Sequence, residues 1–483
     1  MKPGFLRPLL TALPCVFLAA WAQSQPSSPQ PDRSIPVPPA VIRPPDAPLL
    51  EKSVLKDGLT LVLGRLPRPD RPDAVNLSFL FPLGGSGADS PDKRGLARVA
   101  ASLMRGEETG SSPHMRGVME AADRLGVRIQ ANVSKDAMVV SVWTTRDHLG
   151  KTLDLLRTLL KVPAYSDADF QKAIQSAANS FLSPPRGSDA FAQQRLALLL
   201  GLEKPGASGR GISVRDVRDF YDSRLSLKNA ILAAGGGLSM KDLRSQVDKH
   251  LDGRFGSGPS PEAPPVPAVR PVPAQNRAPG VPVHIIAGRQ PFKSRVLVGS
   301  LAVGSGDPDF PAFLVINSVL GDNLITGRLN QSLRENRLWT YSVMSYMQDR
   351  SLGRMYVTET TVKAGLTTAC LMGILDEFRR IGDAPVSPEE LEKAKIHAIH
   401  EIRSTLETPQ GASLGTATGV FYKPSEASIG YLERDVERVG SADVLRVARK
   451  ILNPQTLAVV IDGNANLVLS QLTSLGGIRI SVE

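Results

Sequence analysis

The chain has 483 residues, more than a single hydrophobic core usually holds, so two or more domains are expected. Apolar residues make up 42% and charged residues 22%, a composition that excludes a disordered chain and is typical of soluble globular proteins. The formal net charge is +10, but the basic residues are scattered rather than gathered in runs. This distribution favours a solvated basic surface over a nucleic-acid-binding one.

The first 22 residues have the pattern of a secretory signal peptide. Lys2 and Arg7 give a positive start, residues 9–20 form an apolar run, and residues 20–22 (Ala-Trp-Ala) place small residues at a cleavage site. The run is too short to span a membrane comfortably, and no later segment reaches transmembrane length. We therefore expect a periplasmic or secreted protein with no integral membrane segment after cleavage. Cleavage would leave Cys370 as the single cysteine, which excludes an intrachain disulfide and favours a packed, inert thiol.

Two proline-rich segments organise the rest of the chain. Nine prolines fall between Pro26 and Pro48, within an extended arm predicted for residues 23–49. Nine more fall between Pro259 and Pro282, and because proline-rich sequence prefers extended geometry and forms no ladders, residues 254–282 are predicted to be a semi-rigid linker. The linker separates two halves of similar length, 50–253 and 283–483.

Each half alternates predicted strands and amphipathic helices in the same order. Helix starts are marked by Ser and acidic residues, and helix interiors by leucine at helical spacing. In the first half the predicted elements are a strand at 137–145, a helix at 149–160, a helix opening at Ser166, a helix opening at Ser213 and a strand at 230–234. In the second half they are a strand at 355–361, a helix opening at Ser387, a helix opening at Ser441 and a strand at 457–461.

The ordered matches predict an internal duplication. Ser166 and Ser387 open similar helices 221 residues apart, and Ser213 and Ser441 lead to similar strands at an offset of 228. The predicted fold class is α+β: two homologous halves, each a mostly antiparallel sheet with helices on one face. Gly235-Gly236-Gly237 follows a strand without the Lys-Ser/Thr of a phosphate loop, so a turn is predicted there.

The segment from Phe81 to Ala97 (FPLGGSGADSPDKRGLA) resembles the opening of the pitrilysin/insulinase zinc peptidases. In active members of that family, Gly-Leu-Ala is followed by His-x-x-Glu-His on a helix. The resemblance implies that the two histidines bind zinc from adjacent turns, and that the Glu between them is the general base for the attacking water.

This chain lacks those groups at the matching positions. Arg98 and Ser102 stand at the two ligand positions and Ala101 at the base position. A guanidinium repels a cation, a Ser hydroxyl is a poor zinc ligand, and Ala cannot accept a proton. The family's third ligand, a Glu about seventy-five residues later, corresponds to the region of Asn179, which contains no acid. We therefore expect no metal in this chain and no peptidase activity of the chain alone.

The second half keeps a different family motif. The segment from Leu333 to Ser342 (LRENRLWTYS) closely resembles the family's Leu-Arg-Glu-x-Arg-Gly-x-x-Tyr-Ser, with Leu338 in place of the usual Gly. In two-subunit bacterial members, one subunit carries zinc and the other contributes this Arg and Tyr to the shared active site. The resemblance implies that Arg334 orients the substrate and that Tyr341 donates a hydrogen bond to the developing oxyanion, in trans.

Less specific readings of several residues remain open. Without the family motif, Arg334 and Tyr341 would be a surface ion-pair residue and a core tyrosine, seven residues apart on one helix or across a helix end. His397, His400 and Glu401 share a predicted helix but have no evident third ligand, so helix-surface residues are favoured over a metal site.

The resemblance thus implies an exported, non-catalytic subunit that pairs with a zinc-bearing homologous subunit and acts on peptides. The alternative is a non-enzymatic scaffold or assembly protein of an envelope complex, because core proteins of a respiratory complex resemble this family without cleaving anything. A pure scaffold has no need of Arg334 and Tyr341, so this pair discriminates between the two hypotheses.

Overall fold

The computed structural model of the chain describes most of both predicted halves. The described residues are 50–64, 73–105, 113–160, 166–178, 184–203, 211–251, 280–288, 290–321, 326–350, 353–423, 430–473 and 475–483. The predicted signal peptide, the proline-rich arm and nearly all of the linker lie outside them. All described residues belong to one unit, Ala47–Glu483. Among them, no helix combines the length and the apolar character that crossing a membrane requires.

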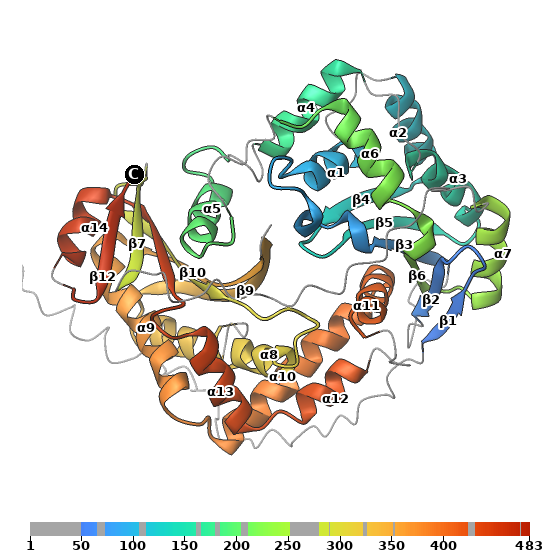
Figure 1. Ribbon diagram of the computed structural model, residues 1–483. Coiled ribbons are helices and arrows are strands. Elements are labelled where there is room, and N and C mark those ends of the chain that lie inside the picture. The colour runs from blue at the N-terminus through green and yellow to red at the C-terminus, as the bar shows by residue number, and fades with distance from the viewer. Residues whose placement is uncertain are drawn as a thin grey trace, which may run out of the picture. The chain divides into compact units, whose positions relative to one another are not determined.

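A six-stranded sheet forms the centre of the first half (Figure 1). Its strands lie in the order β1-β2-β6-β3-β5-β4, and every neighbouring pair is antiparallel except β2 and β6. The bounds are β1 Glu51–Val54, β2 Thr60–Gly64, β3 Ala74–Phe81, β4 Arg128–Val133, β5 Met138–Thr145 and β6 Ile231–Gly236.

The second half contains another six-stranded sheet, in the order β12-β7-β11-β8-β10-β9. Its inner pairings repeat those of the first sheet, since β7 and β11 are parallel and β8 is antiparallel to both β11 and β10. The bounds are β7 Val281–Ala287, β8 Lys293–Leu301, β9 Thr340–Arg350, β10 Gly353–Lys363, β11 Ala458–Gly463 and β12 Ile478–Val482. The shared topology confirms the predicted α+β fold class with two homologous halves.

Helices of each half cover one face of its own sheet and enclose a large apolar core. The helices of the first half are α1 Leu96–Arg105, α2 Pro113–Leu125, α3 Leu149–Leu160, α4 Asp167–Ala177, α6 Val214–Arg224 and α7 Met240–His250. Those of the second are α8 Phe310–Leu320, α9 Thr367–Asp383, α10 Pro388–Leu406, α12 Tyr431–Glu437, α13 Ser441–Ile451 and α14 Ala465–Leu472. A π-helical segment, η6, spans Asn330–Glu335.

Two further helices cover the other face of the sheets, and each comes from the opposite half. Helix α11 (Pro409–Tyr422) packs on β6, β3 and β2 of the first sheet, and α5 (Asp189–Leu199) packs on β11, β8 and β7 of the second. Each contact has its own apolar cluster, around Ala417 and Val420 for α11 and around Phe191 and Leu196 for α5. The halves therefore exchange equivalent helices, which the sequence did not predict.

The exchange depends on glycines where helix and strand approach most closely. A Cβ at Gly235 would lie 2.2 Å from the carbonyl oxygen of Pro409, and one at Gly299 would lie 2.7 Å from the Leu196 side chain. The prediction of a turn at Gly235–Gly237 is therefore wrong for Gly235 and Gly236, which belong to a strand. Strand β6 continues through Gly236, because Gly235 makes room for α11 rather than bending the chain.

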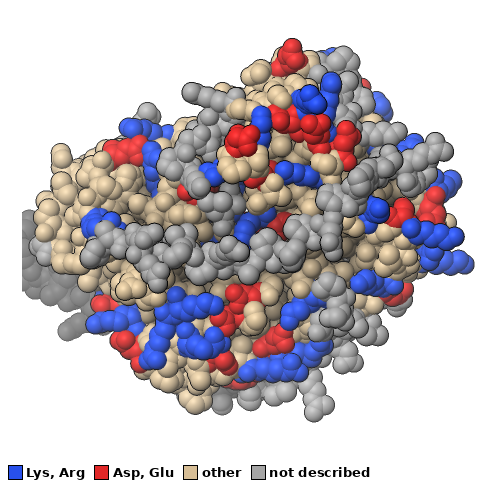
Figure 2. Space-filling model, in the orientation of Figure 1, with Lys and Arg blue, Asp and Glu red and all other residues tan. Residues whose placement is uncertain are grey.

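The local predictions match most of the element bounds. The leucine-spaced helix is α3, with the predicted ends, and Ser166 and Ser213 cap α4 and α6 through reciprocal hydrogen bonds with Asp169 and Asp216. Strand β7 begins at Val281, two residues before the predicted start of the second half at 283. Basic and acidic side chains are interspersed over the face in Figure 2, in keeping with a solvated surface.

Candidate functional site

Helix α1 carries the positions that match the family's zinc-binding residues. The helix follows β3 and two short 3₁₀ turns, and Asp89 caps it by accepting hydrogen bonds from the N–H groups of Gly95 (3.1 Å) and Ala97 (3.3 Å). Ala101 is 1% exposed and lies in the apolar core of the first half, and Ser102 is 4% exposed. The base position and one ligand position have therefore become interior positions of the first half.

Arg98 faces charged groups of the second half. Burial lowers the pKa of its guanidinium, and the like charge of Arg350 lowers it further, whereas Glu203, Asp89 and Asp349 act in the opposite direction. A guanidinium, a methyl group and a hydroxyl do not fit zinc. Among the described residues, no three His, Cys, Asp or Glu side chains are grouped so as to hold a metal ion. His397, His400 and Glu401 are among the described residues, so they do not form such a group. Asn179 lies outside the described residues.

The charges that surround Arg98 form a buried ionic cluster. Arg350, at the end of β9, is 4% exposed, and its guanidinium donates hydrogen bonds to Glu203 (3.4 Å) and Gln348 (2.8 Å). Burial raises the pKa of Glu203, although Arg350 and Arg98 oppose that shift. Because Arg98 and Glu203 belong to the first half and Arg350 to the second, the degenerate helix takes part in an electrostatic contact between halves.

A second buried ionic contact lies nearby in the sequence, at the start of β10. The Nη2 atom of Arg354 donates to Asp136 Oδ2 and to the Tyr422 hydroxyl, each at 2.7 Å, and Tyr422 also donates to Asp136 at 2.7 Å. Arg354 Nε lies 2.6 Å from Asp349 Oδ1. Arg354 is 4% exposed, and although its burial opposes the shift, the nearby acidic groups raise its pKa. Asp136 is in the β4–β5 turn, so this contact also joins the two halves.

Arg334 and Tyr341 lie side by side across the end of η6. Arg334 is in the last turn of the π-helical segment, and Tyr341 is the second residue of β9, so the pair straddles a helix end rather than sharing one helix. The Arg334 guanidinium lies over the Tyr341 ring, 5.4 Å from its centroid, and Arg334 Nε is 3.2 Å from Glu335 Oε1. Tyr341 is 85% exposed.

In the turn between them, Leu338 stands at the position of the motif's usual glycine and has a left-handed backbone. Leu338 has φ +54°, the sole non-glycine residue with positive φ in the part of the chain that the structure describes. This conformation is easy for glycine but costs other residues about 1–2 kcal/mol. The Leu338 side chain is 83% exposed. The departure from the motif therefore introduces strain and an exposed apolar side chain, while the left-handed turn stays.

The pair lies far from the chain's own degenerate helix. Tyr341 and Arg350 are nine residues apart on β9, and at about 3.3 Å per residue this corresponds to about 30 Å. Arg350 is the last residue of β9, and its positive charge acts on Arg98. The Arg334–Tyr341 pair and Arg98 therefore lie toward opposite ends of β9.

Two family models match the sequence. Residues 73–198 match the model described as insulinase (peptidase family M16), and residues 211–397 match the peptidase M16 inactive domain. Together they cover more than half of the chain, and the second match begins within the first half. The chain belongs to the M16 family. It is of the non-catalytic type in this family, because it lacks the His-x-x-Glu-His motif at 98–102. No curated protein matches the sequence.

Solved structures share this M16 fold at low sequence identity. The peptidase M16 inactive domain from Pseudomonas fluorescens has a TM-score of 0.68 at 16% identity, covering 86% of this chain and 98% of that one. A protease from Helicobacter pylori has a TM-score of 0.67 at 16% identity, covering 86% and 100%. A chain of complex III2 from Candida albicans with Inz-5 bound has a TM-score of 0.66 at 14% identity, covering 87% and 97%.

Sequence reasoning missed the ionic residues of the two contacts between the halves in this M16 chain. Asp349, Arg350 and Arg354 flank a short hairpin connection between β9 and β10, where charged residues normally indicate a solvated turn. No local signal distinguishes them from surface residues, because their partners Asp136 and Glu203 are more than a hundred positions away. Only the contact between the halves identifies them.

Proposed function

We propose that this protein is an exported, non-catalytic M16 subunit that supplies Arg334 and Tyr341 to the active site of a zinc-bearing homologous subunit. One observation carries the proposal: the Arg334 guanidinium stacks on a Tyr341 ring that is 85% exposed. A tyrosine that served only the fold would bury its ring, since the ring contributes most of its stabilising area. Here the motif residues are held together at a surface.

The two side chains suit acyl-transfer chemistry on a peptide. The Tyr341 hydroxyl can donate a hydrogen bond to the oxyanion that develops on the scissile carbonyl, and the Arg334 guanidinium can orient a backbone carbonyl or carboxylate through its planar fork. The stacking contact at 5.4 Å fixes their relative position before substrate arrives. Pre-organised donors cost no reorganisation during the reaction, which is why such an arrangement favours the transition state.

The reaction centre in this proposal belongs to the partner. Arg98, Ala101 and Ser102 provide neither ligands nor a base. The second-half charge with the largest effect on Arg98 is that of Arg350, which lies about 30 Å along β9 from Tyr341. A zinc-bearing homologue that faces the Tyr341 end of this chain would supply both missing parts. The signal-peptide pattern of residues 1–22 supports a periplasmic or secreted location for the complex.

A scaffold role is the second candidate, because a chain of complex III2 has the same fold. The test is affinity capture of the mature chain from a periplasmic extract, followed by mass spectrometry. The proposal expects one dominant homologue that carries His-x-x-Glu-His, and peptide cleavage by the reconstituted pair. Recovery of self-associated chain alone, or of envelope-complex subunits, would favour the scaffold.

A further inference from the structure

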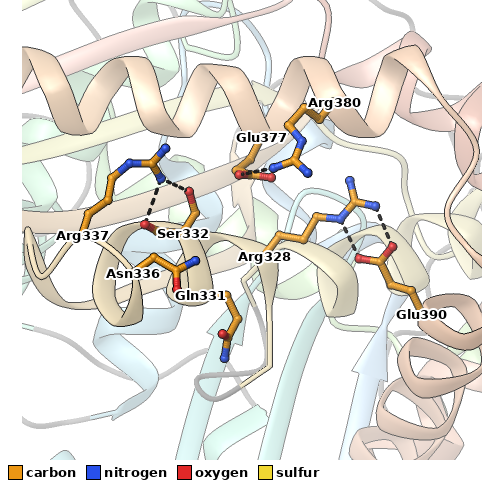
Figure 3. A pocket seen from close by; sticks show the side chains of 8 residues that line it. All are labelled: Arg328, Gln331, Ser332, Asn336, Arg337, Glu377, Arg380 and Glu390. Atoms are coloured by element: carbon orange, nitrogen blue, oxygen red, sulfur yellow. Dashed lines mark hydrogen bonds and ion pairs between the residues drawn. The ribbon is translucent and has the colours of Figure 1, made fainter.

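A polar cavity of about 570 Å³ opens in the second half between η6, the start of α10 and α9 (Figure 3). Its size is that of a small-molecule site, and the described residues that line it are all charged or polar. It is separate from the Arg334–Tyr341 pair, neither member of which lines it. Figure 3 shows Glu377 and Arg380 extending from the helix on one side, toward Arg328 and Asn336 on the other.

Glu377 is the unusual member of this cavity. The residue is 3% exposed, and its Oε1 accepts a hydrogen bond from Arg380 Nη1 at 3.0 Å. Its Oε2 is buried and has no hydrogen-bond partner. A buried carboxyl oxygen without a donor costs about 1–3 kcal/mol, so the cavity lacks one donor group at this atom.

Glu390 is the other acidic residue that lines the cavity, but both of its carboxylate oxygens already accept hydrogen bonds. Arg328 Nε and Nη2 donate to the two oxygens of Glu390, each at 2.6 Å, in a bidentate contact. The hydrogen bond to Glu390 raises the pKa of Arg328, although burial opposes the shift. This pair closes one side of the cavity and leaves Glu377 as the acceptor with spare capacity.

Two arginines provide the opposite charge. Arg380 makes one hydrogen bond with Glu377, its side chain is 65% exposed, and it lines the cavity. Arg337 donates through Nη1 to the backbone oxygen and hydroxyl of Ser332. A guanidinium has five donors, so both retain N–H groups for a carboxylate. A buried acceptor therefore lies directly beside Arg380, and Arg337 lines the same cavity.

We propose that this cavity binds a free α-amino acid. The ammonium group would donate to Glu377 Oε2, and the carboxylate attached to the same carbon would accept from Arg380 and Arg337. The adjacent Glu377 and Arg380 are the charge complement of adjacent ammonium and carboxylate groups. The amides of Gln331 and Asn336 line the remaining space, which suits a polar side chain. The inference does not depend on the proposed peptidase role.

Isothermal titration calorimetry of the mature chain tests the site, with L-glutamine as the probe. Saturable binding at one site per chain is expected. N-acetyl-L-glutamine lacks the ammonium and L-glutaminamide lacks the carboxylate, so each should bind at least about tenfold more weakly. Glycylglycine carries both charges on separate residues and should also bind more weakly. Equal binding of glutaminamide or glycylglycine would assign the cavity to peptide ends instead and overturn the proposal.

Variants locate the binding. Glu377→Gln keeps the side-chain shape and Arg380→Gln changes a largely exposed group, so the second variant remains informative if the first unfolds. Each should weaken L-glutamine binding at least about tenfold. Arg379→Gln is the matched control, because Arg379 is a neighbouring exposed arginine that pairs with Asp376 at 3.0 Å and does not line the cavity. No heat of binding, or equal binding by all three variants, would refute the site.

Discussion

The α1 region and the η6–β9 turn carry the two family motifs, and the structure treats them in opposite ways. In α1, Ala101 and Ser102 are buried and Arg98 faces the charges of Glu203 and Arg350. In the turn, Tyr341 and Leu338 are more than four-fifths exposed, and Leu338 holds a strained backbone. Arg98 now takes part in an electrostatic contact between the halves, while Ala101 and Ser102 are interior positions of the first half. The turn that carries Arg334 and Tyr341 stays accessible, and its strain lies at Leu338, the position that departs from the family motif.

The largest effect is expected where the ionic contacts join the halves. Arg354→Met leaves Asp136 and Asp349 without their buried partner, so the free energy of unfolding should fall by about 3–5 kcal/mol. Urea denaturation measures it. Arg379→Met is the matched control at an exposed ion pair and should change stability by less than about 1 kcal/mol. Equal effects of the two variants would show that the contact between halves does not stabilise the fold.

The second prediction separates the Tyr341 end of β9 from its interior. Tyr341→Phe removes one oxyanion donor, so turnover of the reconstituted pair should fall about 10²–10³-fold, while the melting temperature stays unchanged. Arg334→Lys keeps the charge but loses the planar fork, and should also slow cleavage. Steady-state peptide hydrolysis and thermal melts measure both.

Tyr346→Phe is the matched control on the same strand. The Tyr346 hydroxyl donates to Glu359 at 2.8 Å and is half-buried, and burial is the main cause of its raised pKa. This variant should lower the melting temperature and leave the cleavage rate unchanged. Parental rates for Tyr341→Phe and Arg334→Lys would make the pair vestigial and favour a scaffold.

A smaller effect is expected at the strained turn. Leu338→Gly relieves the positive φ, and should raise the free energy of unfolding by about 1 kcal/mol. Leu338→Ala keeps the strained backbone while removing the exposed side chain, so it should leave stability close to the parental value. The measurement is the denaturant midpoint of the parental protein and of the two variants. If Leu338→Ala stabilises the protein as much as Leu338→Gly, the effect comes from the exposed side chain and not from the backbone strain.

The smallest expected effect is that of zinc. Arg98, Ala101 and Ser102 cannot coordinate it, so the purified mature chain should retain no stoichiometric zinc, and chelators should not shift its melting temperature. Mass spectrometry of the metal content measures this directly. One tightly held zinc per chain would contradict the contrast between the two regions.

The sequence alone determined the duplication, the fold class and most helices and strands. These properties depend on local signals, such as the leucine spacing of α3 and the capping serines before α4 and α10, which act within a few residues. The family motifs likewise placed Arg334 and Tyr341 together, because only seven positions separate them.

Only the tertiary structure decided how the two halves interlock. The exchange of α5 and α11, the ionic contacts of Arg350 and Arg354, and the unpaired oxygen of Glu377 all depend on residues that are distant along the chain or on the exact enclosure of one atom. A charged residue in a hairpin has the same local pattern whether it meets water or a partner from the other half. Burial is a property of the assembled fold, so it sets the roles that local pattern leaves open.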